Sequence, residues 1–448
     1  MIIKRDFYLN KLISRRDNGR IKVITGIRRC GKSVLLFDLF RNYLIESGID
    51  PGQIIIIKLD KIAYSRYRNP NELDLYIHNN ISDKGKRYYV LIDEIQEVVS
   101  IPNPWLNDKN ETIGFVDVLL GLLDLENVDI YITGSNSKML STDIMTEFKD
   151  RGDEIHVNPF MYKEFYDAYE GDKHNAWQEF ITYGGLPRVI SEKSTEEKSH
   201  YLQNLIQRTY LTDVIERNNI NNEISVLDDL LNIIASSIGS LTNPTKLENT
   251  FASVKQKKVA DSTISIYLNY FFEAYLIRKA TQYNIKGKKY INTPLKYYFT
   301  DVGLRKAHLN SRQQEETHTM ENVIYNELCA RGFNVDVGVV DYNYKDDEGK
   351  SKRAKLEVDF VANKGNNRCY IQSAFAIPNE EKRKQETNSL RHINDSYKKI
   401  VVVRDHIIPW YDEYGIYYIG VEDFALKYID EIGRYGQLSP IIADYRQL

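Results

Sequence analysis

One run of eight residues constrains the fold of this chain more than any other feature. Residues 26–33 read GIRRCGKS and match the pattern G-x-x-x-x-G-K-[ST] at every fixed position. The run follows the strand-like segment IKVIT and precedes SVLLFDLFRNYLI, a segment of helical character. A strand, a glycine-rich loop and a helix in this order form the phosphate-binding unit of P-loop proteins. The alternative is an ordinary strand-to-helix turn.

The residue types of this loop suit a bound nucleotide. Glycines let backbone N–H groups turn toward phosphate oxygens, the lysine ammonium reaches the β- and γ-phosphates, and the serine hydroxyl is a ligand for Mg²⁺. We therefore expect ATP and Mg²⁺ as ligands. The residues predicted to bind the nucleotide are Gly26, Arg28, Arg29, Cys30, Gly31, Lys32, Ser33 and Val34.

A second apolar strand ends in two acids. The segment RYYVLIDEIQ carries Asp93 and Glu94 directly after YYVLI. In ATPases an acid at this place holds the water shell of Mg²⁺, and the next acid polarises the attacking water. We therefore predict that Ser33 and Asp93 hold the metal, and that Glu94 makes the protein hydrolyse ATP rather than only bind it. The alternative for such a pair of acids is a helix cap.

The strand-like segment DIYIT leads into a polar turn that contains Ser135 and Asn136. A polar side chain at the end of a strand between the two Walker strands can orient the lytic water, as sensor-1 residues do in additional-strand NTPases. Asn136 is predicted to be catalytic in this way beside Lys32 and Glu94. Ser135 is an alternative, and a helix N-cap is another. Arg151 is a candidate arginine finger and equally a surface arginine.

Residues 1–160 alternate between short apolar runs and segments of helical length. Buried strands that alternate with helices form a parallel sheet with helices on its faces, which predicts the α/β fold of a P-loop ATPase domain. The predicted strands are Ile21–Thr25, Gln53–Leu59, Tyr88–Ile92, Asp129–Thr133 and Glu154–Val157. From 161 to 222 the pattern becomes helical and polar, which predicts a helical extension.

Residues 223–306 have the element order of a winged helix domain, three helices followed by a two-stranded wing. The helices are predicted over 223–239, 243–253 and 261–277, and the strands over 277–284 and 289–301.

The same region is basic. Residues 221–310 hold twelve Lys and Arg against seven Asp and Glu, a net charge of +5. Basic residues before the predicted recognition helix and in the wing tip could contact DNA phosphates on either side of a groove. They are Lys255, Lys257, Lys258, Lys286, Lys288 and Lys289. The alternatives are a solvated basic face and a module that docks a protein.

Residues 307–448 return to an α/β pattern. A helix over 321–331 precedes predicted strands at Phe333–Val340, Lys355–Val361, Cys369–Phe375, Lys399–Val403 and Ile416–Ile419.

This last region has the order of a restriction-endonuclease-like core, with Glu321 on a helix and Asp359 at the end of LEVDF. Such a site needs two acids for Mg²⁺ and a lysine. The following strand places Gln372 and Ala374 where an acid and the lysine would stand. Without that ammonium, cleavage loses its main electrostatic support. We therefore predict an inactive nuclease-like domain, and the alternative is migration of Lys382 or Lys384 into the site.

Composition excludes several classes of protein. The chain has 448 residues, 42% of them hydrophobic, and a net charge of −3. It is therefore neither a disordered tail nor a collagen, and its gross charge does not point to nucleic acid. Its three cysteines, Cys30, Cys329 and Cys369, form no disulfide framework. A charged N-terminus and apolar clusters far shorter than a bilayer span predict a cytoplasmic protein without a membrane segment.

The motifs of the chain together resemble a known family. TGIRRCGKSVLL, VLIDEIQEV, ITGSNSKML and YGGLPRVI look like the bacterial and archaeal AAA-type (AAA_14-like) ATPases that carry a C-terminal domain of unknown function, DUF4143. LKYYFTDVGLRKA, ENVIYNEL and LEVDF resemble that C-terminal region. The resemblance spans almost the whole chain.

The leading hypothesis is an ATP-dependent molecular switch. Mg·ATP would bind between the N-terminal domain and its helical extension, and hydrolysis would reposition the winged helix and the nuclease-like module against DNA or a protein partner. An ATP-regulated DNA endonuclease and a protein-remodelling or signalling ATPase without nucleic acid are the alternatives.

Overall fold

The computed structural model describes residues 3–105, 111–134, 148, 151–220, 224–310, 315–345 and 349–432. The chain forms two compact units. The first unit comprises Met1–Phe160, Leu186–Ser191 and Asn269–Leu276, and the second comprises Met161–Gly185, Glu192–Leu268 and Ile277–Leu448.

The first unit is built on a parallel sheet with the strand order β2-β3-β6-β1-β7 among the described residues. The strands are β1 (Ile21–Thr25), β2 (Ile54–Lys58), β3 (Tyr88–Asp93), β6 (Val128–Thr133) and β7 (Gly152–His156). Every residue of β1, β3 and β6 is buried, as expected for strands covered on both faces. The parallel α/β sheet predicted from the apolar runs is confirmed.

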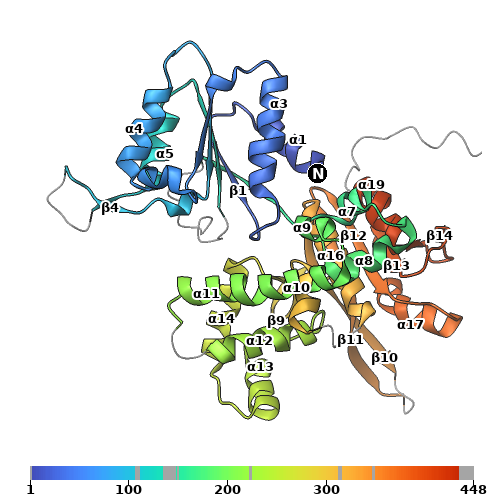
Figure 1. Cartoon of the computed structure of the whole chain (residues 1–448). Coiled ribbons are helices and arrows are strands. Elements are labelled where there is room, and N and C mark those ends of the chain that lie inside the picture. Colours follow the sequence, from blue (N-terminus) through green and yellow to red (C-terminus); the bar gives the residue numbers. More distant parts are fainter. Residues whose placement is uncertain are drawn as a thin grey trace, which may run out of the picture. The chain divides into compact units, whose positions relative to one another are not determined.

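Helices cover both faces of this sheet. Figure 1 shows α4 and α5 on one face and α1 and α3 on the other. The helices of this unit are α1 (Asp6–Ser14), α2 (Lys32–Val34), α3 (Arg41–Glu46), α4 (Pro70–Asn80), α5 (Phe115–Leu123) and α9 (Pro187–Ser191). Helix α4 begins where its sequence dictates, because Asn69 caps the N–H of Asn71 and Pro70 occupies the first helical position. Its Leu73 and Ile77 pack in the core against the sheet.

The remaining elements of the first unit are short. A small hairpin joins β4 (Ile101–Pro102) to β5 (Thr112–Ile113). The helical stretch that starts at α2 continues through the π-helix η1 (Leu35–Phe40) into α3.

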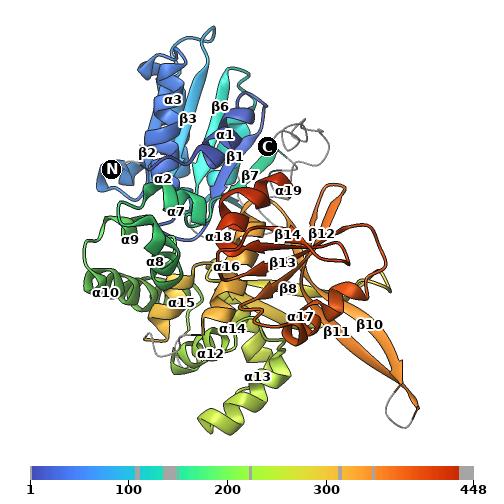
Figure 2. The same cartoon turned by 90° about the vertical axis from the view of Figure 1, so that its right-hand side faces the viewer.

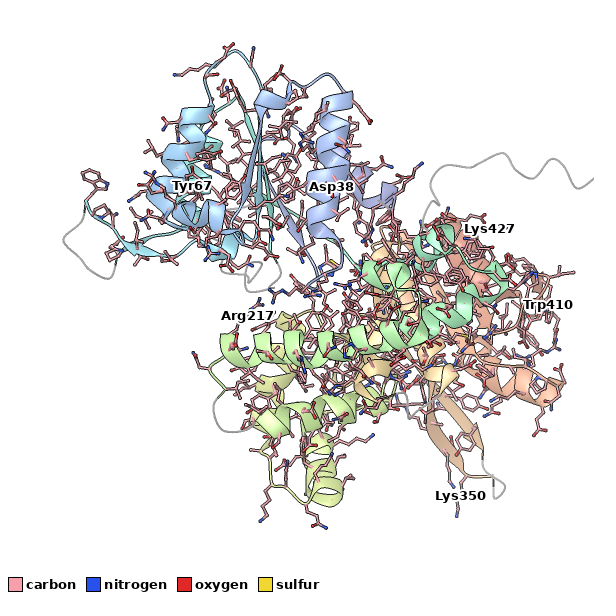
Figure 3. All side chains as sticks on the ribbon, in the orientation of Figure 1. Asp38, Tyr67, Arg217, Lys350, Trp410 and Lys427 are labelled. Carbon is pink, nitrogen blue, oxygen red and sulfur yellow. The ribbon has the colours of Figure 1, made fainter. Side chains whose placement is uncertain are left out.

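The second unit contains a mixed sheet with the strand order β14-β15-β13-β12-β11-β10-β8-β9 among the described residues. The strands are β8 (Ile277–Asn284), β9 (Lys289–Phe299), β10 (Asn334–Lys345), β11 (Ser351–Lys364), β12 (Asn367–Ala374), β13 (Lys398–Val403), β14 (Trp410–Tyr411) and β15 (Ile416–Gly420). In Figure 2 the β10–β11 hairpin extends well beyond the rest of the sheet. Lys350 lies near the tip of this hairpin (Figure 3).

Some helices of the second unit precede this sheet in the chain, and others lie between or after its strands. They are α7 (Tyr162–Ala168), α8 (Ala176–Tyr183), α10 (Thr195–Leu205), α11 (Thr212–Arg217), α12 (Ile224–Ser236), α13 (Pro244–Thr250), α15 (Val302–His308), α16 (Glu316–Ala330), α17 (Glu380–Arg391), α18 (Val421–Asp423) and α19 (Ile429–Ile432). Helix α14 (Asp261–Glu273) begins in this unit and ends in the first.

The segment predicted as a winged helix has the expected elements but not the expected boundary. Helices α12, α13 and α14 precede the β8–β9 hairpin, and Thr242 pairs with Leu295 of β9. However, β8 also runs parallel to β10, with Gln282 opposite Val337. The hairpin is therefore continuous with the C-terminal sheet, and the boundary predicted at residue 306 cuts through that sheet. Sequence could not reveal this, because a hairpin leaves one edge open to any later strand.

Parts of two of the motifs quoted above are tied together inside the second unit. The carboxylate of Asp301 accepts hydrogen bonds from the N–H of Gly185 at 2.7 Å and of Leu304 at 3.0 Å. A Cβ on Gly303 would lie 2.1 Å from the carbonyl oxygen of Tyr183, so only glycine fits there. These residues of YGGLPRVI and LKYYFTDVGLRKA therefore hold helices α8 and α15 together.

No helix in the described part of the chain is long and apolar enough to span a bilayer.

Candidate functional site

The loop predicted to bind phosphates lies between β1 and α2, where its sequence placed it. Gly26 and Gly31 have left-handed φ values of 133° and 98°. A Cβ on Gly26 would lie 2.0 Å from the carbonyl oxygen of Val157, so the loop can follow β7 this closely only with glycine. Arg29 also has a positive φ, of 64°, which is a strained conformation for a residue with a side chain.

Lys32 is buried within this loop. Its side chain is 5% exposed, and its Nζ donates to the carbonyl oxygens of Gly26 at 2.9 Å and of Ile27 at 3.2 Å. The ammonium thus lies over the loop that is predicted to hold the phosphates. Ser33 and Val34, at the start of the helix, are exposed.

Three oxygen-bearing side chains come together at the carboxyl end of the sheet, Ser33 from α2, Asp93 from β3 and Thr133 from β6. The Ser33 hydroxyl donates to Oδ1 of Asp93 at 3.1 Å, and the Thr133 hydroxyl donates to the same oxygen. Strand β6 lies between β1 and β3, which places Thr133 beside Asp93. Burial raises the pKa of Asp93 and the charge of Glu94 adds to this, while the two hydroxyls oppose the rise.

Glu94 follows β3 in a left-handed conformation, with φ of 52°. Its N–H donates to Oγ1 of Thr133 at 3.0 Å, and the Gln96 amide donates to its carboxylate. A backbone held in this region stores strain, which is common at catalytic positions. The predicted general base is therefore fixed at its backbone by Thr133 and at its carboxylate by Gln96.

This arrangement fits a bound Mg·nucleotide. A serine hydroxyl and a carboxylate 3.1 Å apart are oxygen donors of the kind that Mg²⁺ takes beside phosphate oxygens. They lie next to a loop in which Gly26 has no room for a side chain and Gly31 has a left-handed φ. Ser33 and Asp93 are the residues that would hold the ion.

Sequence reasoning missed the residues that brace this site. Thr133 is the last residue of the strand that precedes Ser135 and Asn136, and the prediction that Asn136 orients the water stays a prediction. Ser135 and Asn136 lie outside the described residues. Gln96 belongs to the acidic motif itself, as the last residue of DEIQ.

A second brace comes from the N-terminus. The buried guanidinium of Arg5 donates to the carbonyl oxygen of Cys30 at 2.9 Å and of Asn158 at 3.0 Å, and it lies over the ring of Tyr8. The Tyr8 hydroxyl in turn accepts from the N–H of Asn158 at 3.1 Å. Helix α1 is thereby tied to the back of the loop. No pattern in the first twenty residues of the sequence predicted this contact.

The other predicted nucleotide-site residues take different positions. Arg28 and Arg29 are exposed, whereas Cys30 is buried with its Sγ 3.3 Å from the carbonyl oxygen of Val157. Arg151 directly precedes β7 and is exposed, and its role as an arginine finger stays a prediction.

In the second unit, the predicted nuclease-like acids come together around a lysine that the sequence reading did not select. Lys296 Nζ lies 2.9 Å from Oε1 of Glu321 and 3.7 Å from Oδ1 of Asp359. The two lysines named as alternatives for this site do not lie in it. Lys382 pairs with Glu386 on its own helix at 2.6 Å, and Lys384 is exposed. Lys296 was hidden because it stands in a strand predicted to be part of a separate wing.

The predicted DNA-contacting lysines are partly engaged within the protein. Lys255 and Lys257 both pair with Asp229, at 2.7 and 2.9 Å. Lys296 and Arg305, which contributed to the local net charge, are buried. Less positive charge therefore faces solvent here than the count indicated. Lys258, Lys286, Lys288 and Lys289 are exposed.

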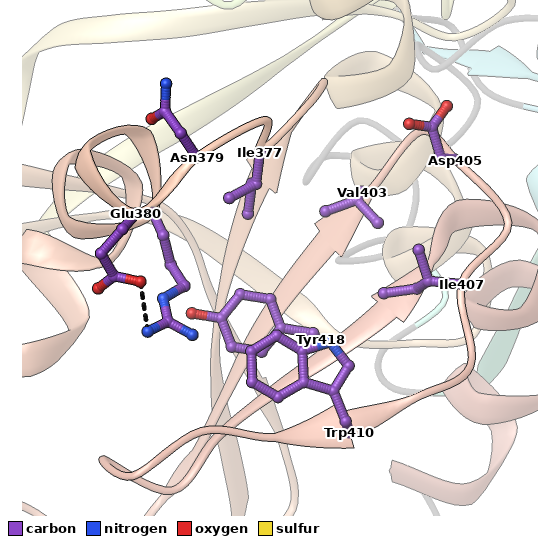
Figure 4. A pocket seen from close by; sticks show the side chains of 9 residues that line it. Ile377, Asn379, Glu380, Val403, Asp405, Ile407, Trp410 and Tyr418 are labelled. Carbon is purple, nitrogen blue, oxygen red and sulfur yellow. Dashed lines mark ion pairs between the residues drawn. The ribbon is translucent and has the colours of Figure 1, made fainter.

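The second unit also contains a pocket of about 310 Å³ at the end of β13 and β15 (Figure 4). Trp410 stacks on Tyr418 with ring centroids 4.3 Å apart, and Arg383 pairs with Glu380 at 2.5 Å. None of the residues predicted from the sequence to bind or to catalyse lines this pocket.

Comparison with protein families assigns two parts of the chain. Residues 18–166 match an AAA domain, AAA_14, and residues 174–315 match a domain of unknown function, DUF8612. The expected second domain, DUF4143, is therefore wrong. The DUF8612 match covers the helical region, helices α12 to α14 and the β8–β9 hairpin.

Among solved structures, the chain is similar to the Walker-type ATPase PABY2304 of Pyrococcus abyssi, with 17% identity and a TM-score of 0.47 over 69% of this chain and 96% of that one. It is also similar to the ORC2 protein of Aeropyrum pernix, with 14% identity and a TM-score of 0.30 over 61% of this chain and 84% of that one. These structural similarities are distant. The P-loop fold is recognised from the AAA_14 family match, the strand order of the first sheet and the loop 26–33.

Two relatives align over nearly the whole chain. An uncharacterized protein of Haemophilus influenzae is 33% identical over 406 residues, 90% of this chain and 93% of that protein. The uncharacterized protein MJ1544 of Methanocaldococcus jannaschii is 30% identical over 451 residues, 94% of this chain and 88% of that protein. The chain therefore belongs to one family with these two proteins, and its N-terminal unit carries a P-loop ATPase domain of the AAA_14 type.

Proposed function

We propose that this protein binds and hydrolyses Mg·ATP at the loop 26–33. The observation that carries the proposal is the convergence of Ser33, Asp93 and Thr133 at one edge of a parallel sheet, beside the buried ammonium of Lys32. Parallel sheets of this kind bind ligands at the carboxyl ends of their strands.

The residues of this edge have distinct tasks in the proposed reaction. Lys32 binds and orients the terminal phosphates, and Ser33 and Asp93 hold Mg²⁺. When bound, the ion neutralises negative charge on the phosphate oxygens. Glu94 takes a proton from the attacking water, and Gln96 and Thr133 fix the direction in which its carboxylate points.

We further propose that the nucleotide state controls what the second unit binds, in a cytoplasmic protein. A ligand shifts such an equilibrium only through contacts that differ between two states. The partner is DNA, reached through the exposed lysines of residues 223–306, or a protein. Pairing of Lys255 and Lys257 with Asp229 weighs against DNA, because both lysines would have to leave that carboxylate to reach phosphates.

We also propose that the C-terminal part of the second unit has a nuclease-like fold. The support is its element order: α16 precedes the antiparallel run β10–β11–β12, and after α17 strand β13 returns parallel to β12. Glu321 on α16 and Asp359 on β11 then occupy the positions of the two acids of such a core.

The experiment that tests the ATPase proposal compares the wild type with Glu94→Gln. We expect the variant to bind ATP with unchanged affinity while turnover falls by roughly 100-fold or more, because the amide cannot take the proton. Turnover is measured as phosphate release, and affinity as displacement of a fluorescent nucleotide. Equal turnover in the two proteins would refute the assignment of Glu94.

The partner is tested in the same assay. We expect ATP turnover to rise with added duplex DNA if DNA is the partner, and this stimulation to weaken as salt increases. An unchanged rate at low salt would favour a protein partner.

A further inference from the structure

Lys296 lies at the centre of a group of three carboxylates in the second unit. Its side chain, on β9, is 3% exposed. Nζ lies 2.7 Å from Oε1 of Glu357, 2.9 Å from Oε1 of Glu321 and 3.7 Å from Oδ1 of Asp359. The three acids come from α16 and β11, so the ammonium joins three elements of the fold.

The two buried carboxylates are also held by groups other than the lysine. The Tyr298 hydroxyl donates to Oε1 of Glu321 at 2.7 Å, and the N–H of Ser373 donates to Oδ2 of Asp359 at 2.8 Å. A Cβ on Gly239 would lie 2.9 Å from Oε2 of Glu321, so the backbone closes tightly over that carboxylate. Without Lys296, Glu321 and Asp359 would each keep one of these hydrogen bonds.

The charges of Lys296 and the three acids change one another's pKa values. Burial acts against the ammonium, but the negative charges of Glu321, Asp359 and Glu357 outweigh it and raise the pKa of Lys296. Burial likewise acts to raise the pKa of Glu321, and Lys296 reverses this and lowers it. Lys296 is therefore a permanent cation facing a charged Glu321.

A nuclease-like fold implies a divalent cation at these acids, and the residues present do not fit one. The third strand supplies Gln372 and Ala374 instead of an acid and a lysine, and Oε1 of Gln372 is buried without a hydrogen-bond partner among the described residues. Over the same residues, no group of three or more His, Cys, Asp or Glu side chains is arranged to hold a metal ion. The ammonium of Lys296 already lies between Glu321 and Asp359.

We propose that the Lys296 ammonium is the resident cation of this site in place of a divalent metal, and that its removal lets Glu321, Glu357 and Asp359 move together into a latent metal site that they do not form while the ammonium lies between them. Carboxylate oxygens converge on Nζ, and such oxygens are the preferred ligands of hard divalent cations. Glu357 is 40% exposed, so the group reaches solvent on that side. In the wild type the site is closed to metal and therefore to metal-dependent phosphodiester cleavage. This inference is independent of ATP hydrolysis.

The test is a titration of the nucleotide-free full-length protein with Mn²⁺, which follows free Mn²⁺ by electron paramagnetic resonance. We expect Lys296→Ala to bind one more Mn²⁺ per chain than the wild type, and Lys296→Ala/Glu321→Gln to lose that gain. Any Mn²⁺ at Ser33 and Asp93 is common to all three proteins and cancels in the comparison. No gain in Lys296→Ala would overturn the proposal.

A matched control comes from the first unit. Lys22 is also fully buried and pairs with a carboxylate, but the pair involves Asp129 alone. We expect Lys22→Ala to gain no Mn²⁺, because one carboxylate does not make a site. A gain as large as that of Lys296→Ala would show that any buried acid left without its lysine takes up the ion, and would overturn the proposal.

A second measurement covers the case in which Lys296→Ala is poorly folded. A metal that binds only the folded state raises the melting temperature. Mn²⁺ should therefore restore Lys296→Ala toward the wild type and leave Lys296→Ala/Glu321→Gln unchanged; absence of restoration counts against the latent site.

The wild type supplies a test that does not depend on any lysine variant. We expect it to bind no more Mn²⁺ than Asp359→Asn and to leave plasmid DNA intact with Mn²⁺ or Mg²⁺. One additional equivalent in the wild type, or cleavage that Asp359→Asn abolishes, would show that a metal coexists with Lys296 and would refute the closed site.

Discussion

The two acidic sites of this protein use the same residue types in opposite ways. In the first unit, Asp93 is contacted by the hydroxyls of Ser33 and Thr133, which donate hydrogen bonds but carry no charge. In the second unit, Glu321 is contacted by the ammonium of Lys296. A hydroxyl leaves the negative charge of its carboxylate available to a cation, whereas an ammonium cancels it.

An acid at a sheet is therefore not enough to identify a metal site. Both Asp93 and Asp359 stand near the end of an apolar strand run; Asp93 is predicted to hold Mg²⁺, and Asp359 takes the place of an acid in a nuclease-like core that is predicted to be inactive. What separates them is the partner that the fold supplies from another strand, Thr133 from β6 in one case and Lys296 from β9 in the other. The group that faces a carboxylate decides its function.

The largest expected effect tests the first site directly. Lys32→Ala removes the only ammonium that we place at the phosphates, and we expect ATP turnover to fall by about 1,000-fold, in line with the loss of one strong electrostatic contact in a preorganised site. Turnover is measured as phosphate release under saturating ATP.

The control for this variant is Lys84→Ala. Lys84 is an exposed lysine in the turn before β3, at the opposite end of that strand from Asp93. Its removal should leave turnover unchanged. If Lys32→Ala hydrolyses ATP as fast as this control, the nucleotide site is misassigned.

The next effect compares the two buried lysines by their contribution to stability. Lys296→Met leaves three carboxylates without their cation, and removal of one partner of a buried ion pair costs about 3–5 kcal/mol of unfolding free energy. Lys22→Met should cost less, because it leaves one carboxylate without its cation instead of three, and Asp129 keeps hydrogen bonds from the Tyr131 hydroxyl at 2.9 Å and from the N–H of Asp17 at 3.0 Å.

Thermal unfolding of the two variants measures this difference. Lys296→Met should show the greater loss of melting temperature in the transition that reports the second unit. An equal or smaller loss than in Lys22→Met would mean that the three carboxylates repel one another little, and that Lys296 is not the centre of the group.

The sequence predicted the parts of these sites that a local pattern carries. Ser33 and Asp93 follow from a loop pattern and from an apolar strand that ends in acids, and the five strands of the first unit follow from their apolar runs. Glu321 and Asp359 likewise follow from their places on a helix and a strand.

The residues that complete each site could not be predicted in this way. Arg5 reaches Cys30 across 25 residues, and Lys296 reaches Asp359 from a different hairpin of the same sheet. Both contacts depend on how separate elements pack, and neither residue differs in its local sequence from a surface cation. The pairing of β8 with β10 had no local signal either, so the hairpin was assigned to a separate domain.

A smaller effect tests the contact that links β6 to β3. Thr133→Val keeps the shape of the side chain but removes the hydroxyl that donates to Asp93 and accepts from the N–H of Glu94. Loss of such a positioning contact should lower kcat by about 10-fold or more, a free-energy difference of the size of one hydrogen bond to a charged group. Thr133→Ser, which keeps the hydroxyl, should behave as the wild type. Equal kcat values for the valine and serine variants would exclude this role.

The smallest expected effect is a pH dependence in the second unit. Burial, with the charge of Glu321, raises the pKa of Asp359 from 3.8 to about 7. Between these two pH values the folded protein holds a proton that the unfolded chain has released, so the free energy of unfolding falls as pH rises through this window and levels off above it.

Asp359→Asn keeps an oxygen that can accept from the N–H of Ser373 but has no proton to lose. Its stability should therefore fall less than that of the wild type between pH 5 and 6, by about 1 kcal/mol, the equivalent of roughly one pKa unit. Chemical denaturation at the two pH values measures the difference; parallel losses in both proteins would mean that Asp359 is already ionised at pH 5 and that Lys296 compensates it more fully than its 3.7 Å distance indicates.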